Sequence, residues 1–120
     1  MNVATARQFI DTLYGPDDLI EVRILGGSRA AFQNWYRAKN LSESVIADLE
    51  KNHEGRNFYL GANARSGRGG TARDVKSANS LFVDWDGIDA HEAKRRIEAA
   101  GLPQPSLLAN SGHGVHAYWL

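Results

Sequence analysis

The apolar segment from residue 81 to residue 87, Leu-Phe-Val-Asp-Trp-Asp-Gly, most constrains what this chain can fold into. Its aromatic and β-branched residues predict a short strand, in which alternate side chains share one face. Asp84 and Asp86 are therefore predicted to lie with Phe82 on one face of a sheet. The apolar residues between them are predicted to point into a core on the other face, namely Leu81, Val83 and Trp85.

The spacing of the two aspartates suggests a metal site. Two residues along a strand span roughly 6.5–7 Å, and at that separation two ionised carboxylates repel by about 2.5 kcal/mol at an effective dielectric of about 20. A cation offsets this repulsion, and oxygen ligands favour Mg²⁺ or Mn²⁺. The alternative is a solvated strand end near Gly87, which is the more common setting for an isolated Asp-x-Asp pair.

Composition limits the class of protein. The chain has 120 residues, of which 42% are hydrophobic and 23% charged, as expected for one globular domain with a modest core. Lys plus Arg and Asp plus Glu number 14 each, so any nucleic acid must be bound by a local basic patch. Cysteine is absent, which excludes disulfides and thiolate metal sites and makes the reducing cytoplasm the expected location. No signal peptide is recognisable, and no apolar run approaches the ~20 residues of a membrane span.

The C-terminal end of the chain is unusual for a natural terminus. The sequence stops within an apolar, strand-like run that ends at Trp119 and Leu120, whereas natural termini are commonly polar and frayed. We therefore expect the chain to be part of a longer protein with further domains.

Hydrophobic periodicity predicts an N-terminal α/β unit over residues 1–62. Ser42 is a suitable N-cap, and Leu41 and Ile46 are spaced as a hydrophobic staple. Residues 28–38 fit either a helix or a strand and are left unassigned. The elements predicted for this unit are a helix over 6–13, a strand over 19–25, a helix from the cap to about residue 52, and a strand over 57–60.

Residues 61–80 are predicted to form a long loop, whose basic and glycine-rich part covers 63–80. The loop contains four glycines and several cations but only one acid, Asp74; its cations are Arg65, Arg68, Arg73 and Lys76. One interpretation is a mobile surface loop, and the other is an anion-binding loop that closes over phosphates. It is not a P-loop, because the required Gly-Lys pair is missing.

Residues 81–120 are predicted to form a second unit of mixed α/β (α+β) class. Asp89 caps a helix, with Glu92 where a capping box would place it, and Gly101 ends that helix. A strand over 106–109, a tight turn over 110–114 and a strand over 115–120 follow. The first crossover suits a βαβ unit and the turn suits a hairpin.

A second cluster of polar residues lies in and after that turn, where the sequence reads Ser-Gly-His-Gly-Val-His over residues 111–116. In a strand from residue 115, His116 and Tyr118 share one face, which we expect to be that of the two aspartates. A histidine beside a carboxylate–metal pair can hold a phosphate or tune a ligand. The alternative is a half-buried strand histidine that bonds a backbone carbonyl. His113, between two glycines, is expected to face solvent.

Together these segments resemble the archaeo-eukaryotic primase superfamily, in particular the primase–polymerase domains of phage, plasmid and mobile-element replication proteins. The family's first motif, an apolar run with Asp-x-Asp, is present as Phe-Val-Asp-Trp-Asp-Gly over residues 82–87. A common form of its second motif, Ser-Gly-x-Gly-x-His-x-Tyr-Trp, is matched in full over residues 111–119. Relatives also carry an Asn-Pro-Arg-like segment after a strand, and here residues 63–65 read Asn-Ala-Arg.

The resemblance implies a fold and an activity. The fold is an N-terminal α/β unit followed by the start of an RRM-like βαββ catalytic unit, and a third-motif aspartate is expected beyond Leu120. The activity is template-directed nucleotidyl transfer by a DNA primase or polymerase, with Mg²⁺ or Mn²⁺, a single-stranded DNA template, nucleoside triphosphates and further domains such as a helicase. Without the third aspartate, the 120-residue chain alone is expected to make little product.

The resemblance also implies residue roles. Asp84 and Asp86 would hold the metal ions, and His116 would contact the triphosphate. Arginines of the basic loop would neutralise phosphate charge, and a small and flexible turn would let backbone N–H groups approach a phosphate. The residues in these last two roles are Arg65, Arg68 and Arg73 for the loop, and Ser111, Gly112 and Gly114 for the turn.

Two other classes of protein remain as alternatives. A relaxase or replication-initiator nuclease also uses an RRM-like sheet, but it requires two histidines one residue apart, whereas His113 and His116 are three apart. A non-catalytic nucleic-acid-binding module would stack bases on aromatic residues such as Tyr118 and Trp85. Two aspartates on the binding face would repel phosphate without a metal ion, so metal dependence separates this class from the enzyme.

Overall fold

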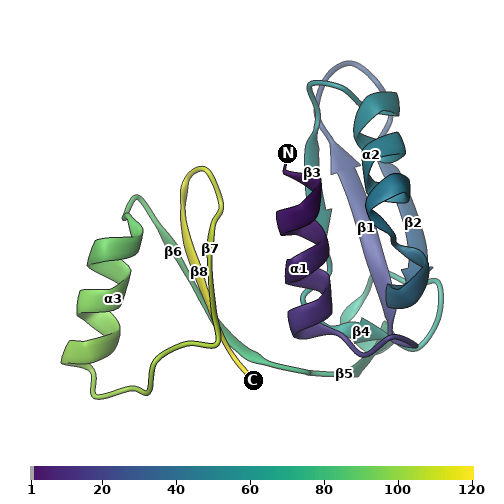
Figure 1. Cartoon of the computed structure of the whole chain (residues 1–120). Coiled ribbons are helices and arrows are strands. Elements are labelled where there is room, and N and C mark those ends of the chain that lie inside the picture. The colour runs from purple at the N-terminus through teal and green to yellow at the C-terminus, as the bar shows by residue number, and fades with distance from the viewer. Residues whose placement is uncertain (1) are drawn as a thin grey trace. The chain divides into compact units, whose positions relative to one another are not determined.

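Helices and strands are divided between two units in the computed structural model, which describes residues 2–120 (Figure 1). The first unit is Met1–Asn79 and the second is Ser80–Leu120, here called the N-terminal and C-terminal units. Each contains an antiparallel β-sheet and at least one α-helix. The mixed α+β class predicted from the sequence is confirmed.

The N-terminal unit is built around β1 (Leu19–Leu25), the central strand of its sheet. One edge of β1 pairs with β2 (Phe32–Arg37), and the other edge pairs with β3 (Asn57–Leu60) and β4 (Ala64–Arg65). A further strand, β5 (Val75–Ser77), pairs with β4. All these pairings are antiparallel, so β1 supplies the backbone partners that hold the sheet together.

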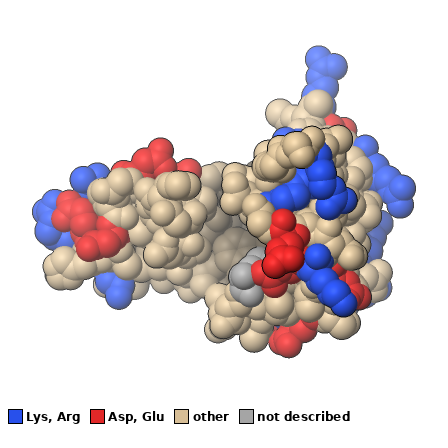
Figure 2. Space-filling model, turned by 90° about the horizontal axis from the view of Figure 1, so that it is seen from above, with Lys and Arg blue, Asp and Glu red and all other residues tan. Residues whose placement is uncertain are grey.

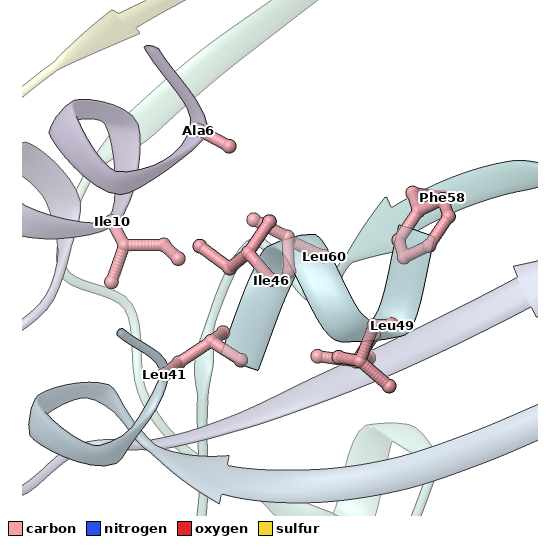
Figure 3. Close-up of a pocket in the computed structure, with 8 residues that line it drawn as sticks. Ala6, Ile10, Leu41, Ile46, Leu49, Phe58 and Leu60 are labelled. Carbon is pink, nitrogen blue, oxygen red and sulfur yellow. The ribbon is translucent and has the colours of Figure 1, made fainter. Parts of the chain in front are cut away.

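Two helices cover one face of this sheet: α1 (Val3–Leu13) and α2 (Glu43–Asn52) (Figure 1). The β1 residues on that face, Ile20, Val22 and Ile24, are at most 1% exposed. Figure 3 shows apolar side chains of both helices and of β3 around a cavity of about 30 Å³, which has no polar lining residue. An apolar cavity of this size gives water no hydrogen-bond partner and is expected to be dry. The opposite side of the sheet, here called the helix-free face, carries the alternate residues of each strand.

The helix boundaries follow from side-chain caps. Ser42 accepts a hydrogen bond from the Val45 N–H, and Asp89 accepts one from the Glu92 N–H, which confirms both predicted N-caps. In a capping box the Glu92 side chain would accept a hydrogen bond from the Asp89 N–H, but here this side chain has other partners. Its carboxylate pairs with Arg95 and Arg96, and these hydrogen bonds lower its pKa to about 2.

The structure settles one segment that the sequence left open and corrects another. The unassigned segment 28–38 contains strand β2, which pairs along most of β1. The predicted loop over 61–80 is not irregular throughout, because it contains β4, a short 3-10 turn over Ala72–Asp74, and β5. Pairing with β1 gives backbone groups of this segment hydrogen-bond partners that a free loop would lack.

The C-terminal unit consists of β6 (Leu81–Asp86), α3 (Ala90–Ala99), β7 (Leu107–Asn110) and β8 (Gly114–Trp119). The strand order is β6-β8-β7, and β8 is antiparallel to both neighbours. Strands β6 and β7 are therefore parallel to each other, as a βαβ crossover requires, with the hairpin strand β8 between them. Helix α3 contacts β8, and its Ala93 and Ile97 are buried.

The predicted core face of β6 is wrong for two of its three residues. Leu81 is 77% exposed and Val83 is 37% exposed, whereas Trp85 is partly buried. The reason is that β6 has only β8 as a pairing partner among residues 2–120, so it lies at the edge of the sheet. Helix α3 contacts the central strand, where Val115 and Ala117 are buried.

In the view of Figure 2, Lys and Arg side chains lie among Asp and Glu side chains, and no broad surface of one sign is seen. Within residues 2–120, no helix is both long enough and apolar enough to span a lipid bilayer.

Ile46 tests the packing of α2 on the sheet, because it is 4% exposed and lines the apolar cavity. We expect Ile46→Ala to lower the free energy of unfolding by about 2–5 kcal/mol, measured by urea denaturation. The control is Asp48→Ala on the exposed side of the same helix, expected to change it by less than about 0.5 kcal/mol. Equal denaturation midpoints for the two variants would contradict this packing.

Candidate functional site

The register between β6 and β8 creates the candidate site. Asp84 lies directly opposite His116, and Phe82 lies opposite Tyr118. Directly opposite residues of an antiparallel pair share a face. The aspartates and His116 therefore lie on one face of the C-terminal sheet, where the sequence motifs predict them.

Asp84, His116 and Tyr118 form a connected set of polar side chains. The His116 Nε2 atom lies 3.1 Å from Asp84 Oδ1, and the His116 Nδ1 atom lies 3.3 Å from the Tyr118 hydroxyl. An Nε2–H group that donates to Asp84 leaves Nδ1 to accept the Tyr118 O–H, so both contacts are satisfied by one neutral tautomer. Burial, with the nearby charge of Asp84, raises the pKa of Tyr118, which keeps its hydroxyl protonated as a donor.

Asp86 lies opposite Gly114, at the end of the strand pair. A Cβ atom on Gly114 would overlap the carbonyl oxygen of Trp85, so this position requires glycine. The turn before it is closed by its own bonds, since the Ser111 N–H donates to the Gly114 carbonyl (3.0 Å) and the Gly112 N–H to Asn110 Oδ1 (2.8 Å).

These bonds change what the turn can offer a phosphate. The N–H groups of Ser111 and Gly112, which the family resemblance would aim at a phosphate, are used within the turn. The exposed hydroxyl of Ser111 is the group that stays available as a donor. His113 is exposed, as predicted, and its carbonyl accepts a hydrogen bond from the Gly87 N–H.

The two aspartates supply some of the oxygen ligands that a hard cation such as Mg²⁺ requires. Asp84 and Asp86 supply carboxylate oxygens on one sheet face, and the Asp84 side chain is 54% exposed. No group of three or more His, Cys, Asp or Glu residues that could hold a metal ion occurs within residues 2–120. Mg²⁺ is commonly held by one or two carboxylates together with water and substrate phosphates, and two aspartates suffice for that mode.

Arg65 is engaged inside the N-terminal unit. Its Nη2 atom lies 2.8 Å from Glu21 Oε2, and its Nη1 atom donates to the Thr71 carbonyl at 2.9 Å. Glu21 is 1% exposed and also accepts hydrogen bonds from Arg23 and Gln33. The two terminal nitrogens of Arg65 are therefore already engaged, one by the buried Glu21 carboxylate and the other by a backbone carbonyl.

Arg68 and Arg73 differ from Arg65 because both are exposed, and neither forms an ion pair with any residue that the structure describes. They are the loop arginines that can meet a phosphate without breaking an internal pair. Both belong to the N-terminal unit, whereas the aspartates and His116 belong to the C-terminal unit.

Two contacts were not anticipated from the sequence. The contact between Tyr118 and His116 was detectable as a spacing of two residues on one strand, which puts both on the same face. The Glu21–Arg65 pair was not detectable, because it joins residues 44 positions apart, and only the charge of Glu21 within an apolar strand pointed to a partner.

Comparison of the chain with protein-family models, with curated proteins and with solved structures finds no match. The assignment of the site therefore depends on the motifs and on the geometry of the β6–β8 pair.

Gly114→Ala tests the strand pairing that builds the site. The added methyl group would overlap the Trp85 carbonyl, and a backbone atom cannot move aside as a flexible side chain can. We expect a loss of about 1–3 kcal/mol in the free energy of unfolding and faster amide exchange in β6 and β8. Ser111→Ala in the same turn is the control, and unchanged exchange in Gly114→Ala would contradict the register.

Arg65→Ala tests whether this arginine is structural. We expect a loss of about 3 kcal/mol in stability, the lower end for a broken buried ion pair, because Arg23 and Gln33 still contact Glu21. In a double-mutant cycle, Glu21→Gln together with Arg65→Ala should cost less than the sum of the single changes. Arg68→Ala, with an exposed side chain, is the control, and additive costs in the cycle would show that Glu21 and Arg65 do not interact.

Proposed function

We propose that the chain carries part of the site of a metal-dependent nucleotidyltransferase that joins nucleotides on a single-stranded DNA template, as a DNA primase or polymerase does. The observation that supports this most is the position of Asp84 opposite His116, with Asp86 on the same face. The two family-like motifs, residues 82–87 and 111–119, are separated in the sequence but lie side by side in the β6–β8 pair. The absence of cysteine suits a reducing cytoplasm, where we propose that this reaction takes place.

The residues of the chain have separate parts in this proposal. Asp84 and Asp86 would hold Mg²⁺ or Mn²⁺, which would supply charge neutralisation at the reacting phosphate. The His116 Nε2 atom, which lies 3.1 Å from Asp84 Oδ1, would donate its N–H group to a phosphate oxygen. Tyr118 keeps the imidazole oriented for that role through its contact with Nδ1.

The charge of a triphosphate requires further cations. The family resemblance assigns this neutralisation to the loop arginines, of which Arg68 and Arg73 are exposed in the N-terminal unit. In the C-terminal unit itself, the exposed Ser111 hydroxyl is proposed as an additional donor. Arg65 is proposed to act indirectly, because its contact with the Thr71 carbonyl holds the loop that carries the other two arginines.

A second candidate function is non-catalytic binding of single-stranded nucleic acid at the same face. Phe82 favours it, since this ring is 47% exposed and lies beside Tyr118 with the ring centres 5.8 Å apart. Exposed aromatic rings on a sheet stack nucleic-acid bases. Such a module would bind nucleotides without requiring a metal ion.

Metal-dependent nucleotide binding separates the two functions. With calorimetry, we expect Mn²⁺ to bind the chain weakly, and we expect Asp84→Asn combined with Asp86→Asn to abolish that binding. Glu98→Gln, which changes an exposed carboxylate of α3, is the control and should bind Mn²⁺ as the unchanged chain does. Equal Mn²⁺ affinity in the double variant and the unchanged chain would rule out the metal site.

The two histidines of the second motif allow a matched pair of variants to be compared for nucleotide binding. His116→Ala should weaken Mn²⁺-dependent binding of a deoxynucleoside triphosphate by about 1.5–3 kcal/mol, the range for hydrogen bonds to charged groups, whereas His113→Ala should have little effect. The reverse result would contradict the assignment of the second motif. Incorporation of labelled nucleotide on a single-stranded template is the direct readout of transfer.

A further inference from the structure

Tyr59, Arg23 and Gln33 on the helix-free face of the N-terminal sheet have no part in the proposed chemistry. Tyr59 on β3 is 51% exposed and lies directly opposite Arg23 on β1. The Arg23 side chain is 45% exposed, and its other neighbour across the sheet is Gln33. An aromatic ring, a guanidinium and an amide therefore form one row across the helix-free face.

The same face carries an excess of positive charge. The strand registers place Arg23, Arg37 and Arg65 on it, and Glu21 is its one acidic strand residue in β1–β4. Glu21 is buried and paired with Arg23 and Arg65, so its charge is neutralised from within. Because the whole chain has no net charge, this excess is a local property of the face.

The basic loop adds two cations because its tip is held against this face. Three side chains of the face donate to three successive carbonyls of the loop, those of residues 69, 70 and 71. The bonds run from Trp35 Nε1 at 3.2 Å, Arg23 Nη2 at 3.2 Å and Arg65 Nη1 at 2.9 Å. Arg68 and Arg73 stand on either side of the held tripeptide and are exposed. A side chain at Gly70 would meet Arg23, Gln33 and Glu21, so glycine permits this close approach.

We propose that this face binds single-stranded nucleic acid through its bases and phosphates, with Tyr59 stacked on a base and the exposed Arg68 and Arg73 placed along the backbone. A single strand presents unpaired bases beside regularly spaced negative charges, which is the chemistry that an exposed ring among arginines recognises. An acidic peptide would use the arginines and leave Tyr59 without a role. The identification of this strand as the template rests on the proposed function; the binding itself does not.

The test measures the anisotropy of a labelled oligothymidine of about 15 nucleotides mixed with the full chain in EDTA, which removes any contribution of metal. We expect Tyr59→Ala to weaken binding about 5- to 100-fold, the range for the loss of one stacked base, and Tyr59→Phe to bind as the unchanged chain does. Arg68→Ala and Arg73→Ala should each reduce the slope of log affinity against log salt by about 0.7.

Lys51→Ala is the matched control, because Lys51 is an exposed cation on α2, on the helix-covered side of the sheet. It should leave both affinity and salt slope unchanged. Affinity that is the same in Tyr59→Ala and the unchanged chain would overturn the proposal, as would an equal effect of Lys51→Ala and Arg68→Ala. Loss of affinity in Tyr59→Ala that Tyr59→Phe does not share supports it.

The experiment also separates this proposal from the proposed function. Asp84→Asn combined with Asp86→Asn should keep its affinity for oligothymidine in EDTA while it loses Mn²⁺ binding. If the chain binds oligothymidine through Tyr59 but shows no Mn²⁺ site, the proposed function fails and the binding face stands. If Mn²⁺ binds at the aspartates and Tyr59→Ala has no effect, the binding face fails alone.

Discussion

The antiparallel register of β6 and β8 is the constraint on which the candidate site depends. Side chains alternate along a strand, so a slip of one residue would move His116 to the face opposite Asp84. The register is supported by Gly114, whose missing side chain allows β8 to approach the Trp85 carbonyl, and by the buried residues Val115 and Ala117 on the other face. The arrangement of the candidate site and the packing of the C-terminal unit therefore depend on one alignment of two strands.

In the N-terminal unit the buried carboxylate of Glu21 fixes how the strands and the basic loop are arranged. Glu21 occupies a position that alternates with apolar core residues of β1, and it accepts bonds from groups on β1, β2 and β4. A buried carboxylate without such partners would cost several kcal/mol, so the loop arginine that neutralises it is held in place. On the helix-free face Tyr59 is exposed, whereas the loop tip is held against the strands by bonds to its carbonyl groups.

Sequence patterns predicted the helices and strands better than the burial and the distant contacts of their side chains. Caps at Ser42 and Asp89, the strand of β1 and the shared face of Asp84 and His116 depend on neighbours within a few residues or on a two-residue period, and these are visible in one chain. The exposure of Leu81 was not visible, because an apolar strand looks the same at the edge of a sheet as at its centre. The occupation of Arg65 was missed for a related reason, since its partner is distant in the sequence.

Because β6 lies at the edge of its sheet, Asp84 and Asp86 also affect whether this strand can pair with another molecule. Among residues 2–120 the outer edge of this strand has no pairing partner, and its first three residues are large, apolar and exposed. Such an edge invites pairing with a strand of another molecule, and charged side chains on an edge strand discourage it. We expect the carboxylates of Asp84 and Asp86 to oppose such pairing, so neutralising both would favour self-association through this edge.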